Sequence, residues 1–292
     1  MLLTIFTPTY NRAYIIGALY HSLCSQTCHD FEWLIVDDGS TDDTSVLVSQ
    51  FIKENRITIR YLKQTNGGKH RAINCGIREA RGELFFIVDS DDKVSPTAVS
   101  DIFEIYRGIS NDETFAGISG LRVHEDGSSI SIGITSEYID ATSLEIRYEH
   151  NVMGDLAEVF KTKVIRQYPF PEYGNEKFVP EALVWNRMAR VGLKLRYTAA
   201  PLYVCEYLPD GLSAAAVSTR MNSPLASTTY YQELLLSQIP FLSKCKAAIN
   251  YWRFYCCKSG ATKPAIPINW SILLPLGFAC HLYDLLSLRP NS

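Results

Sequence analysis

Three carboxylates follow a run of apolar residues in the stretch LFFIVDSDD, residues 84–92. Asp89, Asp91 and Asp92 would repel one another, and apolar surroundings would cost each of them hydration. Oxygen ligands of this kind suit Mg²⁺ or Mn²⁺, which one or two carboxylates hold together with the phosphates of a substrate. We therefore predict a divalent-metal site at this turn. The alternative is an acidic turn that only caps the following helix.

A second acidic pair and a glycine pair mark two further turns. Asp37 and Asp38 end the apolar stretch FEWLIVDD. Their carboxylates could accept hydrogen bonds from a nucleoside base or a ribose, although a simple capped turn is the alternative. Gly67 and Gly68 lie just before Lys69, so backbone and a positive charge can approach an anion there. The glycine pair is weak by itself, because it matches neither a Walker loop nor GxGxxG.

The expected secondary structure brings these turns together. Strands are expected at 2–7, 31–38, 57–63 and 82–92, and helices at 12–26, 42–55, 69–81 and 95–107. Near-continuous apolar strands that alternate with helices indicate a parallel sheet covered on both faces. The last helix is expected to have Ser95 as its cap and Pro96 in its first turn. Since ligands of such sheets bind at the carboxyl ends of the strands, the acidic and glycine turns should share one edge.

The chain after residue 105 is less regular. Strands are expected near 115–123, 156–161 and 202–208, a helix at 180–192 and a mobile loop at 209–224. This half is expected to be mixed and to continue the same sheet.

Charge divides the chain unevenly. The net charge of −3 over 292 residues argues against a nucleic-acid partner, but residues 234–292 carry +5 and residues 1–233 carry −8. Within this tail, the twenty residues 264–283 have no formal charge. Prolines make them a poor transmembrane helix, so we favour an interfacial segment attracted to anionic lipid, with a helix packed on the body as the alternative.

Eight cysteines are present, and the N-terminal MLLTIFTPTYNR does not resemble a signal peptide. We therefore expect reduced thiols in a cytoplasmic protein. Cys24 and Cys28 lie one helical turn apart near two histidines, which permits a zinc site, but ordinary buried thiols are the better interpretation because a second ligand pair at suitable spacing is missing.

Four motifs together resemble the large inverting family 2 of glycosyltransferases, which includes cellulose, chitin and hyaluronan synthases. The stretches are TPTYNR, SLCSQTCHDFEWLIVDDGSTDDT and NGGKHRAINCGIREARGELFFIVDSDD, which contain the segment after the first strand, both acidic turns and the glycine turn. The later helix PEALVWNR falls where the family usually has an acidic pair followed by a Leu and an Arg. The resemblance is dense over residues 2–105 and thinner to about Ser213. It implies an α/β fold of the GT-A type, a Rossmann-like, mostly parallel sheet with helices on both faces, followed here by a helical, basic and aromatic tail. It divides the chain into a nucleotide-sugar-binding half (1–105), an acceptor-binding and catalytic half (106–215) and a C-terminal tail (216–292).

The resemblance also assigns roles to residues. Asp91 would bind Mn²⁺ or Mg²⁺, and the nucleotide donor would contact Pro8, Tyr10, Asn11, Arg12, Asp37, Asp38, Lys69, Asp89 and Ser90. Glu181 would be the catalytic base when the helix is aligned on Arg187, although Pro180 replaces the acid that usually precedes it. Asp155 and Glu176 would bind acceptor hydroxyls. The basic residue that usually closes over the diphosphate is not obvious, and Arg220 is the candidate.

The resulting hypothesis is an inverting, metal-dependent transfer of a sugar from a nucleotide-diphosphate donor, with UDP favoured over GDP or dTDP. The acceptor would be a glycan or a lipid-linked molecule of surface polysaccharide synthesis, at the inner face of the cell membrane. The alternative is a nucleotide-sugar-binding protein without catalysis, which the missing acid at Pro180 keeps open. A haloacid-type phosphatase would need its acidic motif on the first strand, and a phospho-receiver domain would be about half this length.

Overall fold

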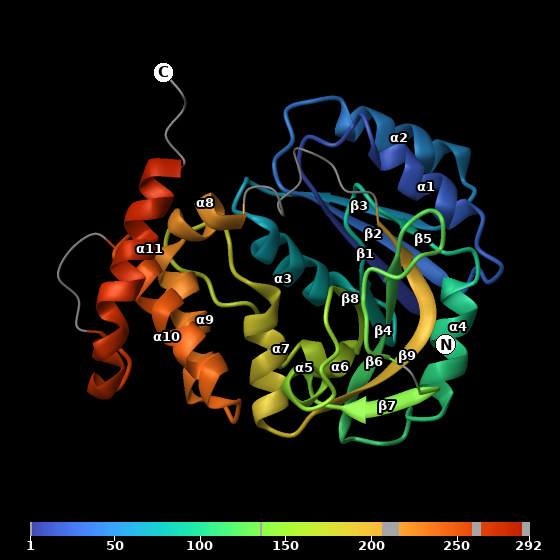
Figure 1. Cartoon of the computed structure of the whole chain (residues 1–292). Helices are drawn as coiled ribbons and strands as arrows, with labels where there is room; N and C mark the ends of the chain where they lie inside the picture. The colour runs from blue at the N-terminus through green and yellow to red at the C-terminus, as the bar shows by residue number, and fades with distance from the viewer. Residues whose placement is uncertain (1, 135, 206–215, 259–263, 288–292) are drawn as a thin grey trace. The chain divides into compact units, whose positions relative to one another are not determined.

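The computed structural model describes residues 2–134, 136–205, 216–258 and 264–287 (Figure 1). It forms two compact units. The first comprises Met1–Phe170 and Arg187–Leu208, and the second comprises Pro171–Asn186 and Pro209–Ser292. The first part of the loop predicted at 209–224, up to residue 215, lies outside the described residues.

The first unit is built on one mixed sheet whose N-terminal half is parallel. β1 (Leu3–Thr9), β2 (Phe31–Asp37), β3 (Ile59–Lys63) and β4 (Leu84–Ile87) lie in the order β3-β2-β1-β4. The ladders β1–β2, β1–β4 and β2–β3 are all parallel. All residues of β1 and β2 are buried, as near-continuous apolar strands predict. The parallel order therefore places the ends of β1 to β4 at one edge.

The sheet continues with strands from the second half of the sequence. The strands are β5 (Lys93–Val94), β6 (Phe115–Val123), β7 (Tyr138–Ala141), β8 (Leu156–Lys161) and β9 (Lys194–Val204), in the order β4-β8-β6-β9-β5 with β7 beside β9. Only β6 and β9 pair in parallel among these described strands. β9 begins earlier than the strand predicted at 202–208, because its register against β6 shifts around Pro201 and obscures the alternation of the sequence.

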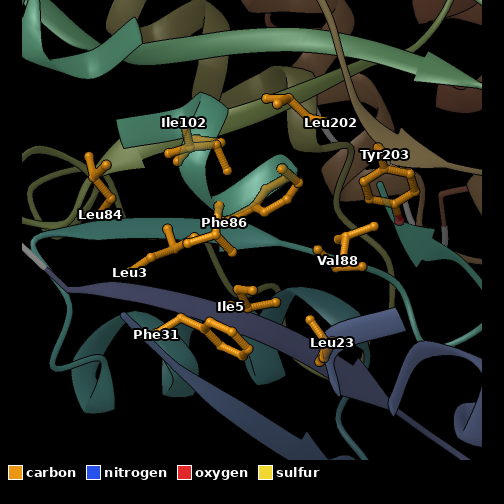
Figure 2. Packing of buried hydrophobic residues seen from close by; sticks show 14 of the residues in the cluster. Leu3, Ile5, Leu23, Phe31, Leu84, Phe86, Val88, Ile102, Leu202 and Tyr203 are labelled. Atoms are coloured by element: carbon orange, nitrogen blue, oxygen red, sulfur yellow. The ribbon is translucent and has the colours of Figure 1, made fainter. Parts of the chain in front are cut away.

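Helices cover both faces of the parallel half. The helices of the first unit are α1 (Ile16–Cys24), α2 (Thr44–Glu54), α3 (Lys69–Glu79), α4 (Ala98–Arg107), α5 (Ser143–Tyr148) and α6 (Thr162–Ile165). Side chains of α1, α2 and α4 share a hydrophobic cluster with alternate residues of the strands, including Leu3, Ile5 and Phe86 (Figure 2). α3 packs on the opposite face, where Gly76 leaves room for the ring of Phe6. The predicted α/β fold with helices on both faces is confirmed.

Two details of this packing concern predictions. α4 begins with Thr97 as its N-cap, not Ser95 as predicted. The Ser95 hydroxyl instead donates to the Pro201 carbonyl of β9, so it joins the helix to the sheet. Cys24 and Cys28 are half-buried thiols that pack against the hydrophobic cluster.

The second unit is helical. It contains the beginning of α7 (Glu181–Arg190), and then α8 (Ala216–Met221), α9 (Pro224–Leu236), α10 (Phe241–Tyr255), the 3₁₀ helix η1 (Ile268–Leu273) and α11 (Leu274–Ser287). α8 replaces part of the predicted loop with helix. α10 packs against both α9 and α11. The predicted helical tail is thus confirmed.

Two buried residues of α11 face α10. A Cβ atom on Gly277 would lie 2.4 Å from Cβ of Trp252, so only glycine permits this approach. Two turns later Asp284, 2% exposed, accepts two hydrogen bonds of 2.6 Å from the Arg253 guanidinium. Asp284, the single acid of residues 234–292, is therefore neutralised inside the helix pair.

Candidate functional site

The acidic turn follows β4 directly, and a tyrosine of another strand closes it. The backbone N–H of Asp89 donates to the Tyr203 hydroxyl over 2.8 Å, and this hydroxyl donates to Oδ2 of Asp92 over 2.8 Å. The N–H of Asp92 also donates to the Asp89 carbonyl over 3.2 Å. Asp92 is thereby held inward and is 8% exposed, whereas Asp91 is half-buried. Asp91 is thus the better placed of the two for an external ligand.

Charge at the turn is only partly compensated. Nζ of Lys69, the first residue of α3, lies 2.6 Å from Oδ1 of Asp89. Burial opposes ionisation of Asp89, but Lys69 and then Arg122 outweigh it and hold its pKa below the ordinary value. The pKa of Asp91 is instead raised, first by burial and then by the charge of Asp89. A cation that arrived at Asp91 would relieve this cost.

The donor set fits a hard divalent cation. Asp89 and Asp91 offer carboxylate oxygens, and within the described ranges no group of three or more His, Cys, Asp or Glu side chains could form a closed metal site. Mg²⁺ and Mn²⁺ are commonly held by one or two carboxylates, with the remaining ligands from substrate phosphates and water. The residues present therefore fit a metal that binds together with a phosphorylated ligand.

The second acidic pair is tied to the glycine turn. Asp38 accepts hydrogen bonds from the N–H groups of Gly67, over 2.9 Å, and Gly68, over 2.7 Å. The Gln64 side-chain amide donates to the same carboxylate over 2.8 Å. Gly68 has φ +99°, a conformation that favours glycine, and it precedes α3. Asp38 therefore fixes the turn that carries Lys69, and its role in direct nucleotide contact stays a prediction.

Asp37 has a structural environment. It is fully buried, accepts a 2.7 Å hydrogen bond from the Ser40 N–H and accepts a hydrogen bond from the Tyr61 hydroxyl. Burial and this carboxylate raise the pKa of Tyr61, so the phenol stays a donor. Asp37 thus shapes the turn after β2, and direct contact of this carboxylate with a ligand stays a prediction.

The segment after β1 is tied to the segment after β2. Asn11, with φ +53°, donates its N–H to Oγ of Ser40 over 2.8 Å, and its side-chain oxygen accepts from the Thr41 N–H over 2.8 Å. The N–H of Arg12 donates to the Thr44 hydroxyl over 3.1 Å. Pro8 is buried, whereas the Tyr10 ring is 46% exposed. Among these predicted residues, Tyr10 is the one whose ring is available to stack on a ligand.

The predicted acids of the second half have separate places. Asp155 is exposed in the loop before β8 of the first unit. Glu176 belongs to the second unit, where its carboxylate accepts from the N–H groups of Leu225 and Ala226 over 2.7 and 2.8 Å. It therefore caps the N-terminus of α9. Glu181 is the first residue of α7 and also belongs to the second unit. The roles predicted for these three acids are not tested by this geometry.

The structure therefore brings together most of the predicted site. The turns after β1, β2 and β4 and the glycine turn after β3 meet at the carboxyl edge of the parallel strands. Sequence reasoning missed Tyr203, Tyr61 and Arg122. Arg122 carried a weak signal, because a charged residue interrupts the apolar stretch FAGISGLRV. The two tyrosines carried none, since their partners are far away in the sequence.

Comparison with known proteins gives a consistent result. A sequence profile described as "Glycosyl transferase family 2" matches residues 4–150. A Campylobacter jejuni protein named GalNAc(5)-diNAcBac-PP-undecaprenol beta-1,3-glucosyltransferase is 28% identical over 185 residues, which cover 60% of this chain and 57% of that protein. The chain spans about half or less of the length of several other curated relatives.

Solved structures share the fold. Staphylococcus aureus TarS 1–349 in complex with UDP-GlcNAc has a TM-score of 0.63 at 18% identity, over 97% of this chain and 89% of that one. Mannosyltransferase PcManGT from Pyrobaculum calidifontis, in complex with GDP-Man and Mn²⁺, has a TM-score of 0.57 at 18% identity, over 99% of this chain and 76% of that one. At this identity the likeness concerns the fold alone.

Proposed function

Because the chain belongs to glycosyl transferase family 2, we propose that it is an inverting glycosyltransferase that moves a sugar from a nucleotide-diphosphate donor to a hydroxyl group. The observation that carries the proposal is the meeting of four turns at one sheet edge. They bring the half-buried Asp91, the Lys69–Asp89 ion pair and the glycine turn held by Asp38 to the same place. Ligands of open α/β sheets bind at this edge.

Each part of the edge has a proposed task. Tyr10 stacks on the base, and the turn held by Asp38 brings backbone close to the nucleoside and diphosphate. Lys69 at the start of α3 exchanges its partner Asp89 for a phosphate oxygen. Asp91 holds Mn²⁺ or Mg²⁺, which would supply positive charge to stabilise the leaving diphosphate.

We propose a UDP-sugar as the donor. Structural neighbours of this chain have been solved with UDP, UDP-GlcNAc or GDP-Man, and two of them with Mn²⁺. These complexes support a nucleotide sugar with a divalent metal as the ligand class. The preference for UDP over GDP is the part that a binding screen must decide.

For the acceptor we propose a glycan or a lipid-linked molecule of surface polysaccharide synthesis. The name of the Campylobacter relative contains an undecaprenol diphosphate, which supports an acceptor anchored in a membrane. In the proposed displacement, the acceptor oxygen bonds to the anomeric carbon as the bond from that carbon to the diphosphate breaks. Glu181 takes the proton of the hydroxyl, which makes a weak nucleophile stronger.

The test is a donor screen. Binding of UDP-, GDP- and dTDP-sugars is measured by thermal shift and calorimetry with and without Mn²⁺, and transfer is followed by release of nucleoside diphosphate with glycan and lipid-diphosphate acceptors. We expect Mn²⁺-dependent binding of a UDP-sugar and an inverted anomeric product. Binding without transfer to any acceptor would favour the nucleotide-sugar-binding alternative, and absence of binding would contradict the proposal.

We further propose that the second unit binds an anionic membrane surface. Together η1 and α11 form the helical stretch Ile268–Ser287, which among the described residues is long and apolar enough to span a membrane. Its mean hydropathy is 1.2, and 17% of it is buried. Its exposed apolar side chains are Ile268, Ile272, Leu274, Leu276, Phe278, Leu282, Tyr283, Leu285 and Leu286. We call them the apolar face of α11, with Ile268 and Ile272 contributed by the preceding η1.

Charge supports a lipid partner for this face. Asp284 is buried against Arg253, so the apolar face of α11 carries no acid. Lys244 and Lys246 of α10 remain to attract anionic headgroups. Pro275 lies in the first turn of α11, where proline is tolerated, so the helix is not interrupted. These features fit a helix that lies in the interface.

Liposome flotation tests this proposal. Ile272 is 80% exposed, and Ile272→Glu should reduce flotation with anionic vesicles, whereas the matched change of exposed Val46 on α2, Val46→Glu, should not. Binding should also fall with salt, because exposed charges are screened. Equal flotation of both variants would contradict the proposal. Salt-resistant insertion would indicate a spanning helix, and a sedimentation change caused by Ile272→Glu would indicate a second copy as the partner.

A further inference from the structure

The acidic turn is held by the side chain of Tyr203, which comes from a strand far away in the sequence. Tyr203 of β9 is 0% exposed, and its hydroxyl touches both ends of the turn. It accepts from the Asp89 N–H and donates to the Asp92 carboxylate, each over 2.8 Å. Burial, and then the charge of Asp89, raise the pKa of this phenol, so it remains a donor. One hydroxyl therefore fixes the residues that flank Asp91.

Tyr203 is itself held firmly. The Arg122 guanidinium lies 4.2 Å from the centre of its ring, and Phe86 of β4 meets it edge-on at 6.1 Å. On the neighbouring strand β5, Val94 pairs with Tyr203 in an antiparallel ladder. The ring is thus packed among β4, β5 and β6, with the hydroxyl at the turn. Because the ring is packed on several sides, the position of its hydroxyl is fixed.

The turn needs such support because its charges oppose one another. Asp89, Asp91 and Asp92 lie within four residues, so their carboxylates repel one another. Without a tether, the simplest relief would be for a carboxylate to turn toward water. The Tyr203 hydroxyl instead keeps Asp92 inward and binds the Asp89 backbone N–H, while Asp91 stays half-buried.

We propose that Tyr203 is a positioning residue that holds the Asp89–Asp92 turn in the conformation required for metal-dependent donor binding. The inference rests on the proposed function, because it concerns the same metal and diphosphate. Tyr203 does not touch the ligand in this proposal. It acts through Asp92 and the backbone of Asp89, as partners of metal ligands do when they orient a metal site.

The experiment compares two buried tyrosines in the full chain. Tyr203→Phe removes the hydroxyl from the carboxyl end of β4. Tyr106→Phe removes a hydroxyl that lies 3.0 Å from the Glu83 carboxylate, at the other end of β4, and Tyr106 is 2% exposed. Both changes leave the ring in place. Calorimetry measures the affinity for UDP with and without Mn²⁺, and thermal denaturation measures stability.

We expect Tyr203→Phe to weaken Mn²⁺-dependent UDP binding about 10- to 100-fold, the usual effect of removing a partner of a metal ligand. UDP binding in EDTA should stay within about twofold of the native protein. Tyr106→Phe should leave both affinities unchanged while it lowers the melting temperature. Equal effects of the two variants on Mn²⁺-dependent binding would show that Tyr203 is merely structural and would overturn the proposal.

A second variant covers the case in which Tyr203→Phe does not fold. Asp92→Ala keeps the tyrosine ring but removes the acceptor of its hydroxyl, and it should weaken the same Mn²⁺-dependent affinity. Where both variants fold, the double variant should lose much less than the product of the two single losses, since both break one interaction. If the losses in affinity of the two single variants were fully additive in free energy, the Tyr203–Asp92 hydrogen bond would not be what positions the turn.

The outcome for Asp91 separates this proposal from the proposed function. If Asp91→Ala abolishes Mn²⁺-dependent binding and Tyr203→Phe does not affect it, the function stands and the positioning role fails. If Asp91→Ala also binds UDP and Mn²⁺ as the native protein does, the metal site itself is elsewhere.

Discussion

The two units of the chain use charge and apolar surface in opposite ways. In the first unit the carboxyl edge of the sheet gathers acids, and the pKa of Asp91 is raised because burial and Asp89 both oppose its ionisation. In the second unit Asp284 is neutralised by Arg253, and large apolar side chains of α11 are exposed. Neither arrangement stabilises the folded chain, because buried like charges and exposed apolar side chains both cost free energy. These two features are the basis of the partners that we propose, a cation with a diphosphate for the first unit and a lipid surface for the second.

The largest expected effect concerns Glu181 of the second unit, the proposed catalytic base. Glu181→Gln keeps the size of the side chain and removes the base. Transfer should fall roughly 10²–10⁴-fold while donor affinity is retained. Single-turnover transfer and calorimetry measure the two quantities. If Glu181→Gln transfers sugar at the native rate and Asp155→Asn does not, the base has been misassigned.

The next effect concerns the acids of the first unit. Asp91→Ala should abolish Mn²⁺-dependent donor binding and lower transfer by about 10²–10³-fold, the usual loss when one element of charge stabilisation is removed. Asp38→Ala should weaken UDP binding also in EDTA, because it frees the backbone of Gly67 and Gly68. A calorimetric titration with and without Mn²⁺ distinguishes the two. If Mn²⁺ changed the UDP affinity equally in both variants, the separate roles proposed for Asp91 and Asp38 would be contradicted.

The third effect compares two helical glycines, one in each unit. Gly277→Ala should lower the free energy of unfolding by about 1–3 kcal/mol, because the new Cβ would lie 2.4 Å from Trp252 Cβ. Gly17→Ala in α1 should instead stabilise by up to about 1 kcal/mol, since Phe51 is 4.0 Å away and alanine favours helix. Thermal and urea denaturation measure both. A stabilising Gly277→Ala would mean that α11 is not packed closely on α10.

The smallest effect concerns the pH dependence of stability and Asp42, which lies in the loop after β2. The Asp42 carboxylate accepts from the Ala13 N–H over 3.0 Å and from the Thr44 hydroxyl over 2.6 Å. Burial is the largest single influence and opposes ionisation, but the hydrogen bonds together outweigh it and lower the pKa of Asp42. The folded protein then binds fewer protons than the unfolded chain, so this stabilisation is present above the ordinary Asp pKa and is lost as pH falls through the lowered value.

Asp42→Asn tests this sign. Its melting temperature should be lower than that of the native protein by about 2 °C at neutral pH, the size expected for a loss of about 1 kcal/mol in hydrogen bonding. The difference should disappear in acid, below the lowered pKa. A difference that grows toward low pH would contradict the assignment.

The sequence by itself determined the parallel half of the sheet and the location of the acids. Apolar strands that alternate with helices over residues 2–107 admit few other arrangements, and residues such as Asp38, Gly67 and Asp91 then follow strand ends that share an edge. The four motifs also predicted the family. These features are local, because they depend on periodicity and on residues close together in the chain.

Only the tertiary structure decided which side chains support the site. Tyr203 meets Asp92 across 111 positions of sequence, and Asn11 meets Ser40 across 29, distances over which no periodicity operates. The start of β9 likewise depends on pairing with a distant strand. The helix α8, which occupies part of the segment predicted as a loop, depends on packing with other elements. The same holds for the tail. Composition showed a basic, apolar segment, but the contact of Gly277 and Asp284 with α10 selects which face of α11 is exposed.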